Sequence, residues 1–197
     1  MIICDKEIRT LAEAGMIDPF EPAQVREGMI SYGLSSFGYD LKLAGELRIF
    51  TRKYHISDGE IESATTFIDP KAFDSDIVQP SKLYITPTDS YFIIEAFGSA
   101  LGRSVETLHL PDDVFALCVG KSTYARCGLI VNTTPLEPGW MGKLVIELHN
   151  TTPLPIKVYA SEGIAQLVFF RGNRPEVTYA DRKGKYQGQT GITTARI

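Results

Sequence analysis

One segment carries an acid inside an otherwise apolar strand pattern. Residues 143–149 alternate, which predicts a face of aliphatic side chains directed into the core: Leu144, Ile146 and Leu148. Glu147 falls on the opposite face, beside Val145. An exposed strand glutamate is the commoner explanation of such a residue. If another subunit covers that face, burial raises the pKa of the carboxyl group and lets it exchange protons near neutral pH.

A second segment, residues 120–128, gathers two cations and several hydroxyl groups in the order Gly-Lys-Ser-Thr-Tyr-Ala-Arg-Cys-Gly. A turn of this composition can offer charge, hydroxyls and backbone N–H groups to phosphate oxygens, and a plain solvated β-turn is the alternative. The segment carries only the last part of a P-loop motif. It follows a predicted strand with no evident helix after it, so a P-loop is not indicated.

The third candidate is the C-terminal stretch 179–197, which is rich in glycine and basic residues. It combines aromatic, cationic and amide side chains: Tyr179, Lys185, Tyr186, Gln187 and Gln189. A disordered basic end is one interpretation. A lid that folds over an anionic ligand is the other, and the glycines would permit its hinge motion.

The sequence argues against a zinc site. Zinc-dependent nucleobase deaminases use a His or Cys ligand near a catalytic glutamate, followed by two cysteines separated by two residues. Here Cys118 and Cys127 are nine positions apart, and the three histidines have no ligand spacing. We therefore expect no zinc and no metal ligands among the side chains.

Composition narrows the class of protein. A chain of 197 residues with 44% hydrophobic and 22% charged residues fits one soluble globular domain, 1–197. The net charge of −4 favours neither nucleic acid nor a membrane surface as a partner. The three cysteines imply no disulfide framework, and we find no signal peptide or membrane span, so a cytoplasmic location is expected.

The elements that must position these residues are mostly strands. A short N-terminal helix is expected after a cap at Asp5, ending at Gly15. Strand patterns follow at 39–43, 46–50, 83–86, 91–95, 114–119, 128–132, 142–150, 156–159 and 165–170, with residues 52–66 expected to be a loop. Many short strands with closely spaced turns predict a mostly β domain, a sandwich or a barrel.

Taken together, these segments resemble the dCTP deaminase family of the dUTPase-like superfamily. The resemblance rests on the joint order of several motifs: residues 31–40 (SYGLSSFGYD), 102–106 (GRSVE), 119–128 (VGKSTYARCG), 132–140 (NTTPLEPGW), 162–166 (EGIAQ) and 184–189 (GKYQGQ). It implies a distorted β-barrel (a β-clip) assembled as a homotrimer, with active sites at the subunit interfaces and 179–197 as a lid.

Matched by position, the family's catalytic glutamate, serine and arginine fall on Glu147, Ser122 and Arg126. The resemblance implies a larger set that contacts the substrate: Lys121, Ser122, Thr123, Tyr124, Ala125, Arg126, Pro135, Glu137, Val145, Ile146, Glu147, Gln166, Tyr179, Lys185 and Gln189. Within it, Lys121 through Arg126 form the phosphate-contacting turn, and Val145 and Ile146 flank the base. Glu137, an aspartate in part of the family, lies near the deoxyribose.

The implied reaction is the hydrolytic deamination of dCTP to dUTP and ammonia, with Mg²⁺ on the triphosphate and dTTP as a possible feedback inhibitor. Two alternatives stay open. A dUTPase, or a bifunctional deaminase and dUTPase, would share the fold and use Glu137 to direct a water at the α-phosphate. A nucleotide-sensing trimer without catalysis would share the fold but have no need of Glu147.

Overall fold

The computed structural model describes residues 1–57, 60–63 and 67–197. Two α-helices, a short 3₁₀ helix and fourteen strands make up this part of the chain, so the mostly β prediction is confirmed. The helical elements are α1 (Asp5–Glu13), α2 (Ser122–Arg126) and η1 (Ser75–Ile77). The strands are β1 (Ile17–Asp18), β2 (Gly33–Ser35), β3 (Gly38–Phe50), β4 (Tyr54–Ser57), β5 (Glu60–Ser63), β6 (Val78–Pro80), β7 (Tyr84–Ile85), β8 (Ser90–Ile94), β9 (Ser99–His109), β10 (Val114–Gly120), β11 (Leu129–Asn132), β12 (Met141–Asn150), β13 (Ile156–Tyr159) and β14 (Gly163–Arg171).

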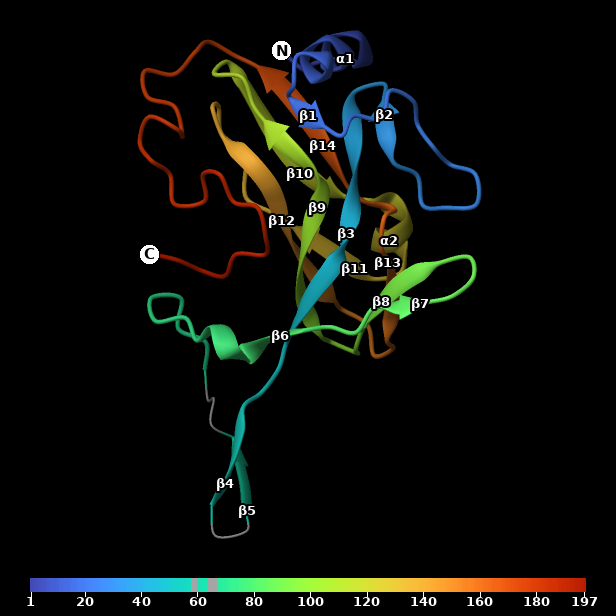
Figure 1. Ribbon diagram of the computed structural model, residues 1–197, viewed down its shortest axis with the longest axis vertical. Coiled ribbons are helices and arrows are strands. Elements are labelled where there is room, and N and C mark those ends of the chain that lie inside the picture. Colours follow the sequence, from blue (N-terminus) through green and yellow to red (C-terminus); the bar gives the residue numbers. More distant parts are fainter. Residues whose placement is uncertain (58–59, 64–66) are drawn as a thin grey trace.

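The main sheet curls into a barrel-like body (Figure 1). Its strands lie in the order β10-β14-β3-β9-β12-β11, and every pair along this path is antiparallel. The short helix α2 joins the first strand of this order to the last, and β10 also packs against β11. The two ends of the sheet therefore meet beside α2, which confirms the expected barrel.

Strand β3 links the two halves of the sheet. Its first half pairs with β14, with Asp40 opposite Gln166, and its second half pairs with β9, with Leu47 opposite Gly102. The register shifts between Leu43 and Leu47, where the strand passes from one partner to the other. Such irregularities bend a strand sharply, and a closed sheet needs that bend.

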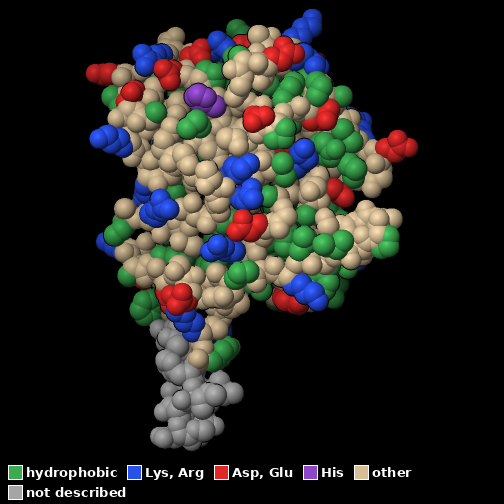
Figure 2. All heavy atoms as spheres, viewed as in Figure 1, with side chains coloured by type: hydrophobic (Ala, Val, Ile, Leu, Met, Phe, Trp, Pro, Cys, Tyr) green, Lys and Arg blue, Asp and Glu red, His purple; other side chains and the backbone are tan. Residues whose placement is uncertain are grey.

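A single large core fills the barrel. Strand side chains that alternate inward are almost fully buried, among them Leu144, Ile146 and Leu148 of β12. This confirms the core face predicted for that strand. Around the core, Figure 2 shows acidic and basic side chains interspersed over the visible face, as a net charge of −4 from 24 acidic and 20 basic residues would suggest.

The N-terminal helix begins one residue earlier than a cap at Asp5 would allow. Cys4 is the N-cap residue and makes no side-chain cap hydrogen bond, while Asp5 is the first helical residue. The prediction of an Asp5 cap is therefore wrong. Asp5 and Glu7 instead place negative charge in the first turn, where it interacts favourably with the helix dipole.

Three other expectations differ from the structure. Residues 52–66 were expected to form a loop, yet β4 and β5 form an antiparallel hairpin there; residues 58–59 and 64–66 of that stretch lie outside the described part. The segment after Gly120 does form a helix, α2, although it has only five residues. The central strand β9 has no counterpart among the predicted strands.

No helix in the described residues has the length and hydrophobicity that crossing a membrane requires.

Candidate active site

Strand β12 places Glu147 in the wall of a cavity that has a volume of about 820 Å³. The cavity lies between β12, the segment that follows β11 and the C-terminal stretch. Seven of the predicted substrate residues line it: Pro135, Glu137, Val145, Glu147, Tyr179, Lys185 and Gln189. Its other walls are largely apolar, with Phe50, Phe73, Leu101, Phe115 and Trp140 among them.

The carboxyl group of Glu147 is tuned toward neutrality. Burial raises its pKa from an ordinary value of 4.5 to about 7, because the charged form loses solvation in the cavity wall. Its Oε2 atom is buried and has no hydrogen-bond partner among the described residues. A carboxyl group with this pKa and a free oxygen can accept a proton from a ligand or water and return it at neutral pH.

The cover over the Glu147 face comes partly from the same chain. Val145, on that face, is only 9% exposed because it packs in a small cluster with Ile77, Val78, Leu101 and Ile192. Ile192 belongs to the C-terminal stretch. The burial that the sequence analysis attributed to another subunit is thus already substantial within one chain.

Thr133 is a cavity residue that the sequence analysis did not assign. It follows Asn132, which lies directly opposite Glu147 in the β11–β12 pair. Its hydroxyl oxygen is buried next to the Cys118 thiol and has no closer hydrogen-bond partner within the described structure. The Cys118 thiol is close by, and burial raises the pKa of that thiol to about 11, so it is protonated at neutral pH. The Asn-Thr-Thr-Pro run at residues 132–135 was the available signal for Thr133, but the sequence analysis predicted a substrate contact only for Pro135.

The C-terminal stretch is fastened to the rim of the cavity. The Trp140 indole donates a hydrogen bond to the carbonyl of Tyr186 at 3.2 Å, and the Tyr186 N–H donates to the Tyr179 hydroxyl at 3.1 Å. Gln189 pairs with β12 through both backbone and side chain, its amide donating to the Lys143 carbonyl at 2.9 Å. Tyr186, which the sequence analysis named in the candidate lid but not among the substrate contacts, also lines the cavity.

Two predicted contacts have their side chains elsewhere. Ile146 is fully buried in the core, on the opposite face of β12 from Glu147. Tyr124 is 3% exposed, and its hydroxyl accepts a hydrogen bond from the Tyr159 N–H at 2.8 Å. For both residues only the backbone is available to a ligand.

The predicted phosphate turn lies outside the Glu147 cavity. None of Lys121 through Arg126 lines it, and Figure 1 shows α2 on the opposite flank of the barrel from the C-terminal stretch. Ser122, Thr123, Ala125 and Arg126 are exposed. Gln166 lies with this second group, opposite Val119 at the end of β10. One chain therefore carries two separate clusters of predicted site residues.

Within the described residues, no group of three or more His, Cys, Asp or Glu side chains is arranged to hold a metal ion. The Glu137 carboxylate, which lines the cavity, is ion-paired with Arg182.

Comparison with known proteins agrees with this architecture. The family described as dCTP deaminase-like matches residues 2–172. A dCTP deaminase from Erythrobacter litoralis is 52% identical over 100% of this chain and 99% of the relative, and one from Acidobacterium capsulatum is 50% identical over 98% and 97%.

A solved structure shares the fold. The crystal structure of 2'-deoxycytidine 5'-triphosphate deaminase from Agrobacterium tumefaciens superimposes with a TM-score of 0.57 at 19% identity. The match covers 87% of this chain and 48% of that one, so this chain spans about half its length. With a family match over nearly the whole barrel and relatives half identical from end to end, the chain belongs to the dCTP deaminase-like family.

Proposed function

We propose that this protein is a dCTP deaminase, which hydrolyses dCTP to dUTP and ammonia and so supplies dUTP to pyrimidine deoxynucleotide metabolism. The observation that carries the proposal is Glu147. Its carboxyl group has a pKa raised to about 7 and a buried oxygen with no partner in the described structure, inside a cavity large enough for a nucleotide. The names of the half-identical relatives support the same substrate.

The proposed reaction consists mainly of proton transfers at the cytosine ring. The Glu147 carboxylate takes a proton from a water as the water oxygen bonds to C4 of cytosine, and the proton passes to N3. In the tetrahedral intermediate the carboxylate takes the proton of the new C4 hydroxyl and passes it to the amino group, so that the C4=O bond forms, the bond from C4 to the amino nitrogen breaks and ammonia leaves. Water thus supplies the O4 oxygen of dUTP, and no redox step is involved.

Ser122 and Arg126 complete the site from a neighbouring subunit. Both are needed beside Glu147 to hold the water and stabilise developing charge. Within one chain, Ser122 and Arg126 lie outside the cavity that holds Glu147. We therefore propose a homotrimer in which α2 of one subunit faces the Glu147 cavity of the next. Aliphatic side chains exposed on the strands next to α2 offer an apolar contact surface: Leu117 (38%), Val119 (44%) and Ile130 (53%).

The triphosphate would lie between the two clusters. Lys121, Thr123 and Ala125 on the turn and Gln166 beside it would meet the phosphates from one side. Tyr179, Lys185 and Gln189 would meet the nucleotide from the other, with 179–197 as a lid over the bound ligand. Pro135, Val145 and the Ile146 backbone would border the base and sugar. Since dTTP offers the same phosphates and sugar, it would bind in the same site as a feedback inhibitor.

Magnesium would enter with the substrate. The Glu137 carboxylate is engaged by Arg182, and the described side chains form no cluster of three metal ligands. The Mg²⁺ ion would therefore be held mainly by phosphate oxygens and water, away from the base. We also propose a cytoplasmic location, which the three free cysteines Cys4, Cys118 and Cys127 support.

The deciding experiment incubates the purified protein with dCTP and Mg²⁺ and measures dUTP, dUMP, ammonia and pyrophosphate. Ammonia with dUTP and no pyrophosphate is the expected result. Ammonia with dUMP and pyrophosphate would make the enzyme bifunctional, and pyrophosphate from dUTP alone would make it a dUTPase. Nucleotide binding without any product would indicate a sensing trimer and overturn the proposal. The Arg182–Glu137 pair favours deamination alone, because it occupies the carboxylate that dUTP cleavage would use.

A further inference from the structure

A buried acid with no part in the chemistry above lies beneath the phosphate turn. Asp40 of β3 is only 1% exposed, and its Oδ2 atom accepts a hydrogen bond from the Lys121 ammonium at 2.5 Å. The Lys121 side chain is itself 12% exposed. This ion pair is therefore largely removed from water, in contrast to the solvated pairs on the surface of the protein, and its geometry is correspondingly restricted.

The contacts of Lys121 fix the direction of its remaining donor. A lysine ammonium has three N–H donors. One is given to Asp40, and a second to the Ser31 hydroxyl at 2.9 Å. With two of three tetrahedral positions held by partners on other segments, the third can point in only one direction. The Lys121 side chain is 12% exposed, so the surrounding protein does not enclose it completely.

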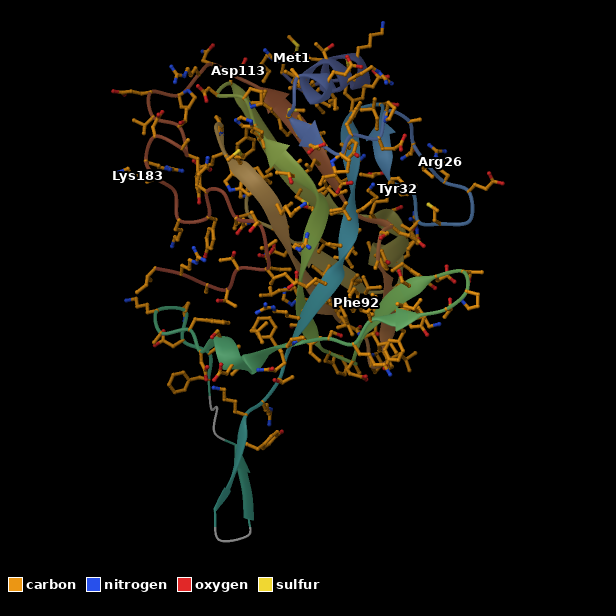
Figure 3. All side chains as sticks on the ribbon, in the orientation of Figure 1. Met1, Arg26, Tyr32, Phe92, Asp113 and Lys183 are labelled. Atoms are coloured by element: carbon orange, nitrogen blue, oxygen red, sulfur yellow. The ribbon has the colours of Figure 1, made fainter. Side chains whose placement is uncertain are left out.

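Asp40 is itself held in place. Its Oδ2 atom also accepts a hydrogen bond from the Gln24 amide at 2.9 Å, and its backbone lies opposite Gln166 in the β14–β3 pair. The Gln166 amide in turn donates to the Ser35 hydroxyl at 2.9 Å. In the sheet, Gln166 of β14 lies between Asp40 of β3 and Val119 of β10, so the Lys121 side chain, which follows β10, reaches Asp40 past β14. Figure 3 places the neighbouring Tyr32 on this flank and Lys183 of the C-terminal stretch on the other.

From this arrangement we propose that Asp40 is a positioning residue for the triphosphate of the substrate, acting through Lys121. It holds the ammonium so that its free donor faces a phosphate oxygen of the nucleotide, and it keeps the start of α2 in register with β3 and β14. The inference rests on the proposed function, since it takes dCTP as the ligand. It adds a residue of β3 that does not itself touch the nucleotide.

The carboxylate charge is the part of Asp40 that matters. An asparagine at this position could still accept a hydrogen bond, but it would leave the partly buried Lys121 ammonium without a counter-ion. The ammonium would then move toward solvent or a different partner. A hydrogen bond to a charged group that is lost or misdirected costs about ten- to a hundredfold in affinity.

The test compares Asp40→Asn with a matched control, Glu106→Gln. Glu106 is also a fully buried acid facing a lysine of the sheet, Lys42 at 3.8 Å, and in the described structure none of its hydrogen bonds or ion pairs involves Lys121 through Arg126. Asp40→Asn should raise the KM for dCTP about ten- to a hundredfold with a small change in kcat. Glu106→Gln should leave the KM within about twofold of the unsubstituted enzyme. An equal rise in both variants would assign the effect to general loosening and overturn the proposal.

A double-mutant comparison shows whether Asp40 acts through Lys121. In a Lys121→Met background, Asp40→Asn should add no further rise in KM, because the ammonium that it orients is gone. An undiminished further rise would overturn the proposal. The double variant removes both charges of the pair, so it can still be compared with Lys121→Met if Asp40→Asn alone does not fold.

The variant Asp40→Glu separates position from charge. It keeps the carboxylate but displaces it by one methylene, so a positioning role predicts a raised KM and a mere charge role predicts none. Titration of each variant with dCMP gives a further readout, because its affinity should fall less than that of dCTP when phosphate contacts are lost. An unsubstituted enzyme inactive on dCTP would instead refute the proposed function itself.

Discussion

Arg182, in the C-terminal stretch, forms an ion pair with Glu137 on the rim of the Glu147 cavity, 45 residues earlier in the chain. The Arg182 guanidinium also lies over the Tyr179 ring, 5.4 Å from its centroid. The acid proposed to lie near the deoxyribose is therefore held by the segment proposed to close over the nucleotide. Sugar recognition and closure of that segment would depend on each other.

Replacing Arg182 with alanine should raise the KM for dCTP about two- to fivefold, because a half-exposed ion pair contributes modestly. Deletion of residues 180–197 should raise it further, since the Tyr186 and Gln189 contacts are lost as well. Steady-state kinetics at fixed Mg²⁺ measures both effects. Lys183→Ala, on the same segment, is the control. A deletion that leaves KM unchanged would show that the segment is not a lid.

Replacing Glu147 with glutamine should lower kcat by a factor of about 10² to 10⁴, the usual contribution of a general acid–base group. Binding of dCTP, followed by calorimetry, should stay within a few fold, because the amide has nearly the shape of the carboxyl group. Glu106→Gln again serves as a matched buried acid outside the cavity. Near-normal turnover by Glu147→Gln would remove the carboxylate from the mechanism.

The pKa of Glu147 also sets an acid limb in the rate profile. The first step needs the ionised carboxylate, and burial raises its pKa to about 7. The value of kcat/KM for dCTP should therefore fall as pH drops below about 7 and level off above it. An acid limb near the ordinary carboxyl value of 4.5, measured over pH 4–9, would contradict the proposed role of burial.

The same pKa shift should make the folded protein less stable as pH rises, whereas kcat/KM increases with pH. Glu147 has a higher pKa in the folded chain than in the unfolded one, so the folded state binds more protons between pH 4.5 and 7. Its contribution to the free energy of unfolding is present below pH 4.5 and is lost as pH rises through 7. Glu147→Gln should thus gain about 1–2 kcal/mol over the unsubstituted protein at pH 8 and little at pH 4.5, measured by denaturant unfolding.

The shared site can be tested by mixing two inactive variants. If Glu147 and Arg126 come from different subunits, co-expressed Glu147→Gln and Arg126→Ala chains should form some interfaces with both residues intact. Random assembly of equal amounts restores about a quarter of the interfaces, so about a quarter of the activity should return. Co-expression of Glu147→Gln with Glu147→Ala is the control and should restore none. Failure of the first pair, with mixed trimers present, would place the whole site in one chain.

The sequence predicted well those elements whose pattern follows burial. The strand at 156–159 matches β13 residue for residue, and the alternation of 143–149 correctly assigned the core face of β12. Strand β9 was not predicted because its buried positions include Gly102, Ser104 and Glu106, none of which is hydrophobic. The hydrophobic periodicity is therefore broken where the strand is most enclosed. Helix α2 is too short for a 3.6-residue pattern to be read.

The candidate site likewise has features that the sequence could predict and others that depend on the three-dimensional fold. Glu147 could be singled out because its chemistry stands out against an apolar strand. The separation of Arg126 from it within one chain could not be read, since it depends on how the sheet closes and which flank each loop joins. Asp40 looked like one polar position in an alternating strand. Only the register of β3 against β14 brings it beneath Lys121.

The two ends of the barrel chain meet late in synthesis. The N-terminal amine of Met1 donates a hydrogen bond to the Arg171 carbonyl at 2.7 Å, and the Ile3 N–H donates to the Phe169 carbonyl at 2.9 Å; Met1 lies at the helical end of the molecule in Figure 3. Strand β3 likewise waits for β14, more than a hundred residues later. In a nascent chain that lacks β14, the edges of β3 and β10 that pair with β14 are exposed, and the barrel cannot close. Folding should therefore be slow and largely post-translational, and incomplete chains should be prone to aggregate.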